Sequence, residues 1–155
     1  MDTSGKKIVY IPGCWDLLHV GHIRVLKAAK ELGDFLVVGI ASDEVIREDK
    51  KRYPVISEAL RQEMIKAVTH VDAAIIYRSL EFVTHLNSIC PNVLAVGEQW
   101  GEEERHKAAI VWAASNRCSV VKLPYTELIS TSMIITRIKF GDNLPIGSSK
   151  KREWI

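Results

Sequence analysis

Strand patterns and helix patterns alternate along almost the whole chain, and this alternation restricts the possible folds more than any other feature. Short apolar runs at residues 7–11, 35–40, 73–76, 93–96 and 120–123 predict strands. Helical spacing and capping residues predict helices over residues 19–32, 57–68, 80–87, 102–115 and 130–139. The pattern therefore predicts an α/β fold, a parallel sheet of about five strands with helices on both faces.

The breaks between these elements carry further expectations. Pro12 and Gly13 are expected to stop the first strand, and the polar, basic stretch 47–53 is expected to be a mobile loop. The turn-rich composition after Gly141 predicts a loosely held tail over residues 141–155, which leaves residues 1–140 as a single domain.

Composition excludes several classes of protein. The net charge of the 155 residues is only +2, so the molecule as a whole is not built to bind a polyanion, and nucleic acid is not an expected partner. Apolar runs fall short of the roughly 20 residues that cross a bilayer, and the N-terminus lacks a signal-like segment. The three cysteines are widely spaced and odd in number, which argues against a disulfide framework. We expect a cytoplasmic protein without a membrane partner.

The segment 13–22, Gly-Cys-Trp-Asp-Leu-Leu-His-Val-Gly-His, lies where parallel sheets bind ligands, just after a strand. His19 and His22 are three residues apart at the start of a predicted helix, so both rings can project from one side of its first turn. Gly13 and Gly21 remove side chains where a ligand would approach closely. Free N–H groups at a helix start bind anions, and imidazoles donate hydrogen bonds to phosphate. Either histidine alone would be explained as a cap or a surface residue, but the pair favours a phosphate site.

The pattern Gly13-x-x-Asp16-x-x-His19-x-Gly21-His22 resembles the signature of the cytidylyltransferase-like nucleotidyltransferases, and the resemblance spans roughly residues 7–139. It implies a Rossmann-like fold. It also implies that His19 and His22 are catalytic, holding a triphosphate and stabilising charge that develops at its α-phosphorus. Asp16 matches the family aspartate and is expected to buttress the turn. The nucleotide-binding residues expected from this segment are Gly13, Cys14, Trp15, Asp16 and Gly21.

Three other segments resemble elements of the same family. Ile129-Ser-Thr-Ser resembles its Ser-Thr-Thr/Ser element at the start of the last helix, where Ser130 would also serve as the N-cap. Val96-Gly-Glu-Gln-Trp resembles an element that lines the nucleotide pocket, and Lys50-Lys-Arg resembles a basic loop that contacts the acceptor phosphate. The additional nucleotide-binding residues implied are Arg61, Gly97, Glu98, Trp100, Ser130, Thr131 and Ser132, and the acceptor-binding residues are Lys50, Lys51 and Arg52.

The reaction implied by the resemblance needs few reactive side chains. A phosphate oxygen of the acceptor attacks the α-phosphorus of CTP or ATP in line, and pyrophosphate leaves. A phosphate monoester is already a nucleophile at neutral pH, so no general base is required, and positioning and electrostatics carry the catalysis. We expect Mg²⁺ to accompany the triphosphate, although no carboxylate cluster identifies its ligands. Members of the family are often homodimers, which is the expectation here.

The donor base and the acceptor stay open at the level of sequence. Glycerol-3-phosphate cytidylyltransferases look alike in Asp16-Leu-Leu-His, whereas the adenylyltransferase part of ADP-heptose synthase shares Gly13-Cys14 and Pro54-Val55. Trp15, Tyr125 and Leu128 depart from the family pattern. A sugar or polyol phosphate is the favoured acceptor, with CTP or ATP as the donor.

Two rival hypotheses come from the same residues. Cys14, Asp16, His19 and His22 are ligand types that suit zinc, so they could form a metal site instead. The departures from the family pattern are also compatible with a nucleotide-binding module that has lost turnover.

Overall fold

The computed structural model describes residues 3–98, 100–124, 126–127 and 129–141, and in these it contains five strands and six helices. The strands are β1 (Ile8–Gly13), β2 (Phe35–Ala41), β3 (Ala73–Tyr77), β4 (Val93–Gly97) and β5 (Ser119–Leu123). The helices are α1 (Val20–Lys30), α2 (Asp43–Lys50), α3 (Glu58–Lys66), α4 (Phe82–Ile89), α5 (Glu104–Ser115) and α6 (Thr131–Phe140).

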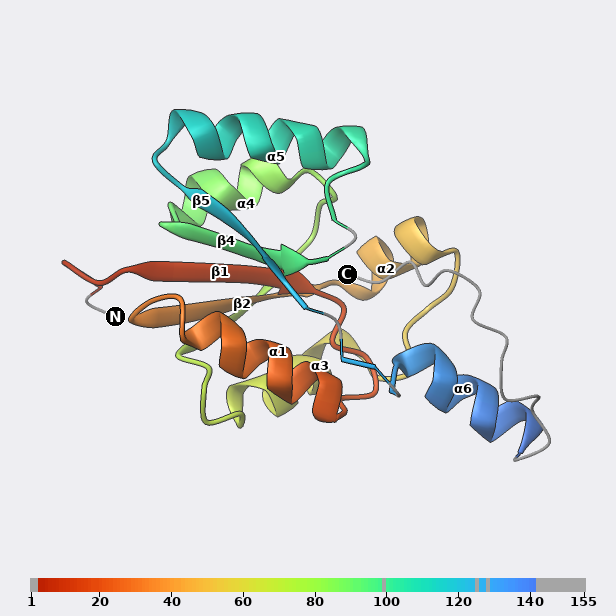
Figure 1. Cartoon of the computed structure of the whole chain (residues 1–155). Helices are drawn as coiled ribbons and strands as arrows, with labels where there is room; N and C mark the ends of the chain where they lie inside the picture. Colours follow the sequence, from red (N-terminus) through yellow and green to blue (C-terminus); the bar gives the residue numbers. More distant parts are fainter. Residues whose placement is uncertain (1–2, 99, 125, 128, 142–155) are drawn as a thin grey trace.

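The strands form one parallel sheet in the order β3-β2-β1-β4-β5. Helices α1 and α3 lie on one face of the sheet, and α4 and α5 lie on the other (Figure 1). The predicted fold class, a Rossmann-like α/β domain, is therefore confirmed. The strand order reverses between β1 and β4, which is where ligands bind in open α/β sheets.

The core is apolar on both sides of the sheet because each face is covered by helices. All seven residues of β2 are buried, as strands sandwiched between two helical layers must be. Leu26 of α1 and Ile65 of α3 are fully buried on one face. Leu86 of α4 and Ala109 of α5 are fully buried on the other face.

Strand β1 runs further than the sequence predicted. Pro12 and Gly13 do not stop it, because both stay in register with Gly39 and Ile40 of β2. Towards β4 the ladder pairs only Val9 with Val93 and Tyr10 with Leu94. Proline has no N–H to donate, so it is tolerated where the ladder on one side has already ended.

The expected loop at 47–53 is wrong for its first half, because residues 43–50 form helix α2. Ser42 caps this helix, with its hydroxyl accepting a hydrogen bond from the Val45 N–H at 3.2 Å. Acidic residues follow in the first turn, where the helix dipole favours them. Val45 and Ile46 are buried and hold the helix to the sheet. Lys51 ends it in a left-handed conformation with φ of 55°.

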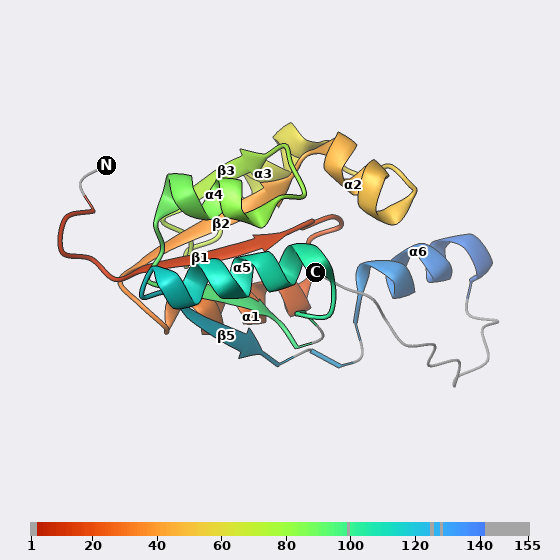
Figure 2. The same ribbon diagram turned by 90° about the horizontal axis from the view of Figure 1, so that it is seen from above.

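Helix α6 extends beyond the carboxyl end of the sheet, apart from the helices that cover its faces (Figure 2). Its outer part exposes two apolar side chains, Ile138 and Phe140. Residues 142–155 lie outside the described part of the chain, so the boundary between a domain at 1–140 and a tail at 141–155 stays a prediction. Among the described helices, none has both the length and the apolar character that a membrane span requires.

Candidate active site

The loop between β1 and α1 contains two residues in the left-handed region that disfavours side chains. Trp15 has φ of 57° and Leu17 has φ of 49°, and neither is glycine. Such conformations cost of order 1 kcal/mol or more each, and they persist where the surroundings hold them. Two such residues within three positions indicate that the surrounding structure holds this loop in a strained conformation, and strained backbone is common at binding sites.

Trp15 holds this loop against the sheet. Its side chain is buried, and the indole Nε1 donates a hydrogen bond to the Gly39 carbonyl at 2.8 Å. A Cβ at Gly13 would lie 2.8 Å from the same indole. The structure corrects the reason given for Gly13, because the space above it is filled by Trp15 and is not left open for a ligand.

His19 and His22 cap helix α1 in a reciprocal arrangement. The Gly21 N–H donates to His19 Nδ1 at 3.1 Å, and the His19 N–H donates to His22 Nδ1 at 3.3 Å. The two rings are stacked, with centroids 3.9 Å apart and planes inclined by 22°. A neutral imidazole that accepts at Nδ1 carries its proton at Nε2. Both histidines therefore keep an Nε2–H donor for a ligand.

The environment keeps both rings neutral in the absence of a ligand. Burial lowers the pKa of His19. Burial also lowers the pKa of His22, to about 3, with a further contribution from the neighbouring His19 and a partial offset from Asp16. Neutral rings donate hydrogen bonds without carrying charge, and a bound phosphate would raise their pKa values.

Gly21 is required by the cap itself. A Cβ at this position would lie 2.8 Å from the His19 ring and 3.5 Å from the side chain of Ile129. The bare glycine therefore admits the His19 ring over the first turn, a different reason from the close ligand approach that the sequence suggested.

The start of α6 lies against the same loop, which joins two motifs that are far apart in sequence. The Thr131 hydroxyl donates to the Asp16 carbonyl at 2.8 Å, across 115 residues. Ser130 caps α6 by accepting from the Met133 N–H at 3.2 Å, and both hydroxyl side chains are buried. Ser132 is half-buried. The structure thus brings the first turns of α1 and α6 to one place, and helix starts in general can bind anions.

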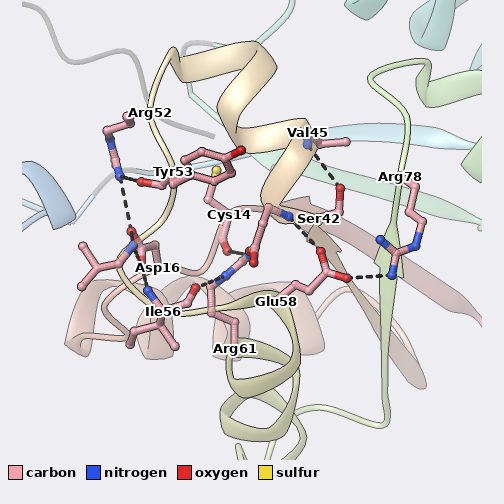
Figure 3. Close-up of polar contacts among 12 residues, drawn as sticks. Cys14, Asp16, Ser42, Val45, Arg52, Tyr53, Ile56, Glu58, Arg61 and Arg78 are labelled. Carbon is pink, nitrogen blue, oxygen red and sulfur yellow. Dashed lines mark hydrogen bonds and ion pairs between the residues drawn. The ribbon is translucent and has the colours of Figure 1, made fainter.

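Asp16 connects this loop to the segment after α2. Its carboxylate accepts from the Val55 N–H at 3.0 Å and from the Ile56 N–H at 3.0 Å, and Arg52 lies 3.4 Å from it (Figure 3). This bonding agrees with the expected buttressing role of Asp16. It also counts against the zinc hypothesis, and no trio of metal-ligating side chains is arranged for a metal within the described residues.

The three predicted acceptor-binding cations follow one another at the end of α2. Lys50 is the last residue of the helix, the Lys51 side chain is exposed, and Arg52 is half-buried. Through Arg52 and the Asp16 carboxylate, this basic segment, residues 50–52, is joined to the loop that carries His19 and His22.

Arg61 does not lie where the sequence suggested. Its side chain is 0% exposed, so in this structure it is not open to a phosphate. The guanidinium donates to the Cys14 carbonyl at 2.5 Å, the Ile56 carbonyl at 2.8 Å and the Asp43 carboxylate at 2.7 Å (Figure 3). Arg61 therefore joins the β1–α1 loop, the start of α2 and the loop before α3. Its charge alone did not reveal this structural role.

The segment after β4 divides between surface and core. Gly97 ends the strand, Glu98 is exposed, and Trp100 is buried. Trp100 packs against the rings of His106, 4.5 Å away, and Phe82, 5.7 Å away. Trp100 is thus part of the core beside the ligand-binding end, and the nucleotide role expected for these residues stays a prediction.

Two buried histidines near this end of the sheet were missed at the level of sequence. His85 lies in α4, 4.6 Å from the Tyr77 ring, and burial lowers its pKa. His106 lies in α5, and its Nδ1 accepts from the Gly101 N–H at 3.3 Å. Neither has a motif around it in the sequence, and only the packing of α4 and α5 reveals their positions.

The model of one protein family, described as cytidylyltransferase-like, matches residues 10–137. The chain belongs to this family. The cytidylyltransferase-like domain thus accounts for nearly the whole described structure, and the chain is a nucleotidyltransferase.

Two groups of relatives are similar to this cytidylyltransferase-like chain. It is 38% identical over 147 residues to the FAD synthase of Thermococcus kodakarensis, which covers 89% of this chain and 96% of the relative. It is 34% identical over 140 residues to the bifunctional protein HldE of Geotalea uraniireducens, covering 90% of this chain but only 28% of that longer protein.

Solved structures agree on the fold. The lipopolysaccharide core biosynthesis protein of Thermoplasma volcanium matches with a TM-score of 0.70 and 27% identity, covering 79% of this chain and 100% of that one. The pantothenate synthetase of Thermus thermophilus matches with a TM-score of 0.60 at 14% identity, covering 86% of this chain and 64% of that one, a likeness of fold alone.

Proposed function

We propose that the chain transfers AMP from ATP to the phosphate of FMN, forming FAD and releasing pyrophosphate. The relatives named FAD synthase match over nearly their whole length, as the 96% coverage of the Thermococcus kodakarensis protein shows. FAD consists of FMN joined to AMP, so a nucleotidyltransferase that makes it uses ATP as the donor. FMN carries its phosphate on a ribityl chain and is therefore a polyol phosphate, one of the two acceptor classes that the sequence favoured.

A sugar phosphate is the second candidate acceptor. It is supported by the 34% identity to HldE and by the likeness to a lipopolysaccharide core biosynthesis protein. Against it stands the coverage, because this chain corresponds to only 28% of HldE.

The observation that carries the proposal is the convergence of donors at one place. The Nε2–H groups of His19 and His22, deduced from their Nδ1 bonds, stand at the start of α1, and the Thr131–Asp16 bond fixes the start of α6 beside them. Oriented donors of this kind stabilise charge that develops on transferring and leaving oxygens. A triphosphate is the ligand that makes use of both helix starts at once.

The proposed step balances without a protein base. The FMN phosphate dianion attacks the α-phosphorus, and a new P–O–P bond forms. The bond from the α-phosphorus to the oxygen bridging towards the β-phosphorus breaks, and pyrophosphate leaves with that electron pair. His19 and His22 donate to phosphate oxygens through Nε2, while the basic segment 50–52 draws the acceptor phosphate towards the α-phosphorus.

We expect Mg²⁺ to arrive bound to the triphosphate oxygens. Mg²⁺ keeps several water ligands and is commonly held through one or two carboxylates and the substrate phosphates. The described residues offer no group of three His, Cys, Asp or Glu side chains arranged to hold a metal ion.

The test is a matrix of donors and acceptors assayed for pyrophosphate release. ATP and CTP are each combined with FMN, glycerol 3-phosphate and a heptose 1-phosphate in the presence of Mg²⁺. The proposal expects turnover with ATP and FMN and formation of FAD. Turnover with a sugar phosphate alone would replace FMN by the second candidate. Nucleotide binding without turnover on any acceptor would identify a non-catalytic module.

We also propose that the chain forms a homodimer. Helix α3 exposes Leu60 and Met64, and the preceding loop exposes Val55. Apolar side chains grouped on one helix are typical of a surface that a partner covers. Light scattering of the purified protein tests this, and a monomer at micromolar concentration would contradict it.

A further inference from the structure

An ion pair crosses the ligand-binding end of the sheet. Arg105 in the first turn of α5 lies 2.6 Å from the Asp49 carboxylate near the end of α2. Helix α2 follows β2 and α5 follows β4, and β1 lies between these two strands. The pair therefore links the elements that follow the two neighbours of β1 in the sheet, beside the point where the strand order reverses.

Asp49, one member of this ion pair, directly precedes the basic segment 50–52 in the chain. On its other side the segment is followed by Val55 and Ile56, whose N–H groups the Asp16 carboxylate accepts. The basic segment thus lies between two anchors. Asp49 directly precedes it, and Asp16 binds Val55 and Ile56, which follow it. Asp16 ties the segment to the β1–α1 loop, and Asp49 ties it to α5 through Arg105.

The anchor at Asp49 lies on the exposed outer half of α2. Val45 and Ile46 are buried and fix the inner half of the helix, but Arg47, Glu48 and Asp49 are exposed as residues. The ion pair with Arg105 therefore ties the exposed outer half of α2 to α5.

We propose that Arg105 is a positioning residue that places the basic segment over the acceptor phosphate by holding Asp49. This inference rests on the proposed function in assigning the acceptor phosphate to residues 50–52. Its consequence is that breaking the ion pair weakens use of the acceptor and leaves the donor nucleotide and the chemical step almost untouched.

Direct contact between Arg105 and the acceptor is the rival explanation. The Arg105 Nε atom is buried and has no hydrogen-bond partner among the described atoms, so it could donate to a ligand. The two explanations differ over Asp49. Positioning requires both members of the pair, whereas direct contact requires only the arginine.

The experiment compares Asp49→Asn, Arg105→Gln and the charge-reversed double variant Asp49→Arg/Arg105→Asp. With ATP and FMN, we expect each single variant to raise the KM for the acceptor about three- to fivefold, the scale of a partly exposed ion pair, with kcat and the KM for ATP within about twofold. We expect the double variant to recover part of the loss, because the pair re-forms with its charges exchanged. The recovery is incomplete because Glu103, which lies 2.6 Å from Arg105 in the wild-type chain, repels an aspartate at that position.

Hydrogen exchange gives a readout that does not depend on turnover. In both single variants, amides of residues 47–53 should exchange faster than in the wild-type chain, while α1 and β2 stay unchanged. Lys30→Gln is the matched control, because Lys30 and Asp72 form an ion pair of the same 2.6 Å length away from the site. This variant should show neither effect.

Several outcomes would overturn the inference. Wild-type acceptor KM in both single variants removes the role, and a loss confined to Arg105→Gln without recovery in the double variant indicates direct contact. A lower acceptor KM in Asp49→Asn shows that Asp49 competes with the acceptor. If the wild-type chain turns over no acceptor, the proposed function fails, and exchange at residues 47–53 alone decides whether the ion pair holds this segment.

Discussion

At the scale of single residues, the site depends on how each histidine divides its two ring nitrogens. The Nδ1 atoms of His19 and His22 accept hydrogen bonds from backbone N–H groups and complete the helix cap, and the proposed function assigns the Nε2 atoms to the ligand. In each ring, Nδ1 thus has a structural role in the cap, and Nε2 has a chemical role in the proposed function. Substitutions that preserve one role and remove the other can separate the two.

The comparison of His19→Asn with His19→Ala makes this separation. Asparagine is a good N-cap and can accept from the Gly21 N–H as Nδ1 does, but it places no donor at the position of Nε2. We expect both variants to lose about 10²–10³-fold in turnover. Only the alanine variant should also lose about 1 kcal/mol of stability, measured by urea unfolding. Wild-type turnover in the asparagine variant would contradict the role of Nε2.

The low pKa of His22 makes stability depend on pH. The folded protein holds this ring neutral down to a pKa of about 3, whereas the unfolded chain protonates it near about 6.5. Between these values the unfolded state binds more protons, so the free energy of unfolding falls as pH falls from about 6.5 towards 3. Solvent screening of the half-buried ring keeps the slope below the limit of about 1.4 kcal/mol per pH unit.

Urea unfolding over this pH range tests the effect, with His22→Asn as the comparison. The variant lacks the titrating ring, so its stability should decline less steeply with acid than that of the wild-type chain. Parallel curves for the two proteins would show that His22 is not held neutral by its surroundings.

Arg61 stabilises the site, so its substitution should lower the free energy of unfolding. In Arg61→Met the Asp43 carboxylate and the carbonyls of Cys14 and Ile56 lose their shared donor, which should cost about 3 kcal/mol. Arg78→Met is the control, because Arg78 is largely exposed and pairs with Glu58 nearby. It should cost less than about 1 kcal/mol by the same unfolding measurement.

At the scale of elements, the site is a junction of helix starts and loops held by few bonds. The β1–α1 loop contacts α6 through Thr131 and the segment after α2 through Asp16. Each element supplies one part of the site, and the sheet only sets their spacing. A change at a junction should therefore alter binding before it alters the sheet.

Thr131→Val and Thr131→Ser test the junction with α6. Valine keeps the shape but removes the buried hydroxyl that donates to the Asp16 carbonyl, which should cost about 1 kcal/mol of stability. We expect the KM for ATP to rise in this variant, because the start of α6 is no longer fixed beside the histidines. The serine variant keeps the hydroxyl and should bind ATP like the wild-type chain. Equal KM values in all three proteins would place α6 outside the nucleotide site.

The sequence predicted the elements whose residues are buried in a regular pattern and missed those defined by capping and pairing. The apolar run of β2 identified its strand, because every one of its residues is buried. Helix α2 was missed because only Val45 and Ile46 are buried among mostly charged residues. Its signal was the cap at Ser42 followed by Asp43 and Glu44, which outweighed the loop-like composition.

The candidate site shows the same division between local and long-range information. His19 and His22 could be found because their spacing, the glycine between them and the preceding strand are all local in the chain. The burial of Arg61 and the left-handed backbone of Trp15 depend on partners far away in sequence. A basic residue looks the same in sequence whether it contacts a phosphate or a carbonyl, so only the fold can assign its role.

At the scale of the whole molecule, the site joins the beginning of the domain to its end. The bond between Thr131 and Asp16 spans 115 residues, and the histidines that flank it come from the first helix. A ligand that contacts both helix starts therefore binds only the completely folded chain and should stabilise all of it.

Thermal unfolding with nucleotides measures this stabilisation. ATP with Mg²⁺ at about 100 times its Kd should add about 2.7 kcal/mol to the free energy of unfolding. CTP at the same concentration should shift the melting temperature less, if adenine is the preferred base. His19→Ala with ATP serves as the control and should show a reduced shift. An equal or larger shift with CTP would contradict the choice of donor in the proposed function.

The early end of the β1–β4 ladder gives this sheet an edge in its middle. Beyond Leu94 the ladder pairs no residue of β4 with β1, although both strands continue to a glycine, Gly97 in one and Gly13 in the other. Unpaired strand edges normally lie at the rim of a sheet, where they invite stray association. Here the residues beyond the ladder, among them Ile11 and Pro12 of β1 and Ala95 and Val96 of β4, are buried, so this internal edge is closed to pairing with another protein chain.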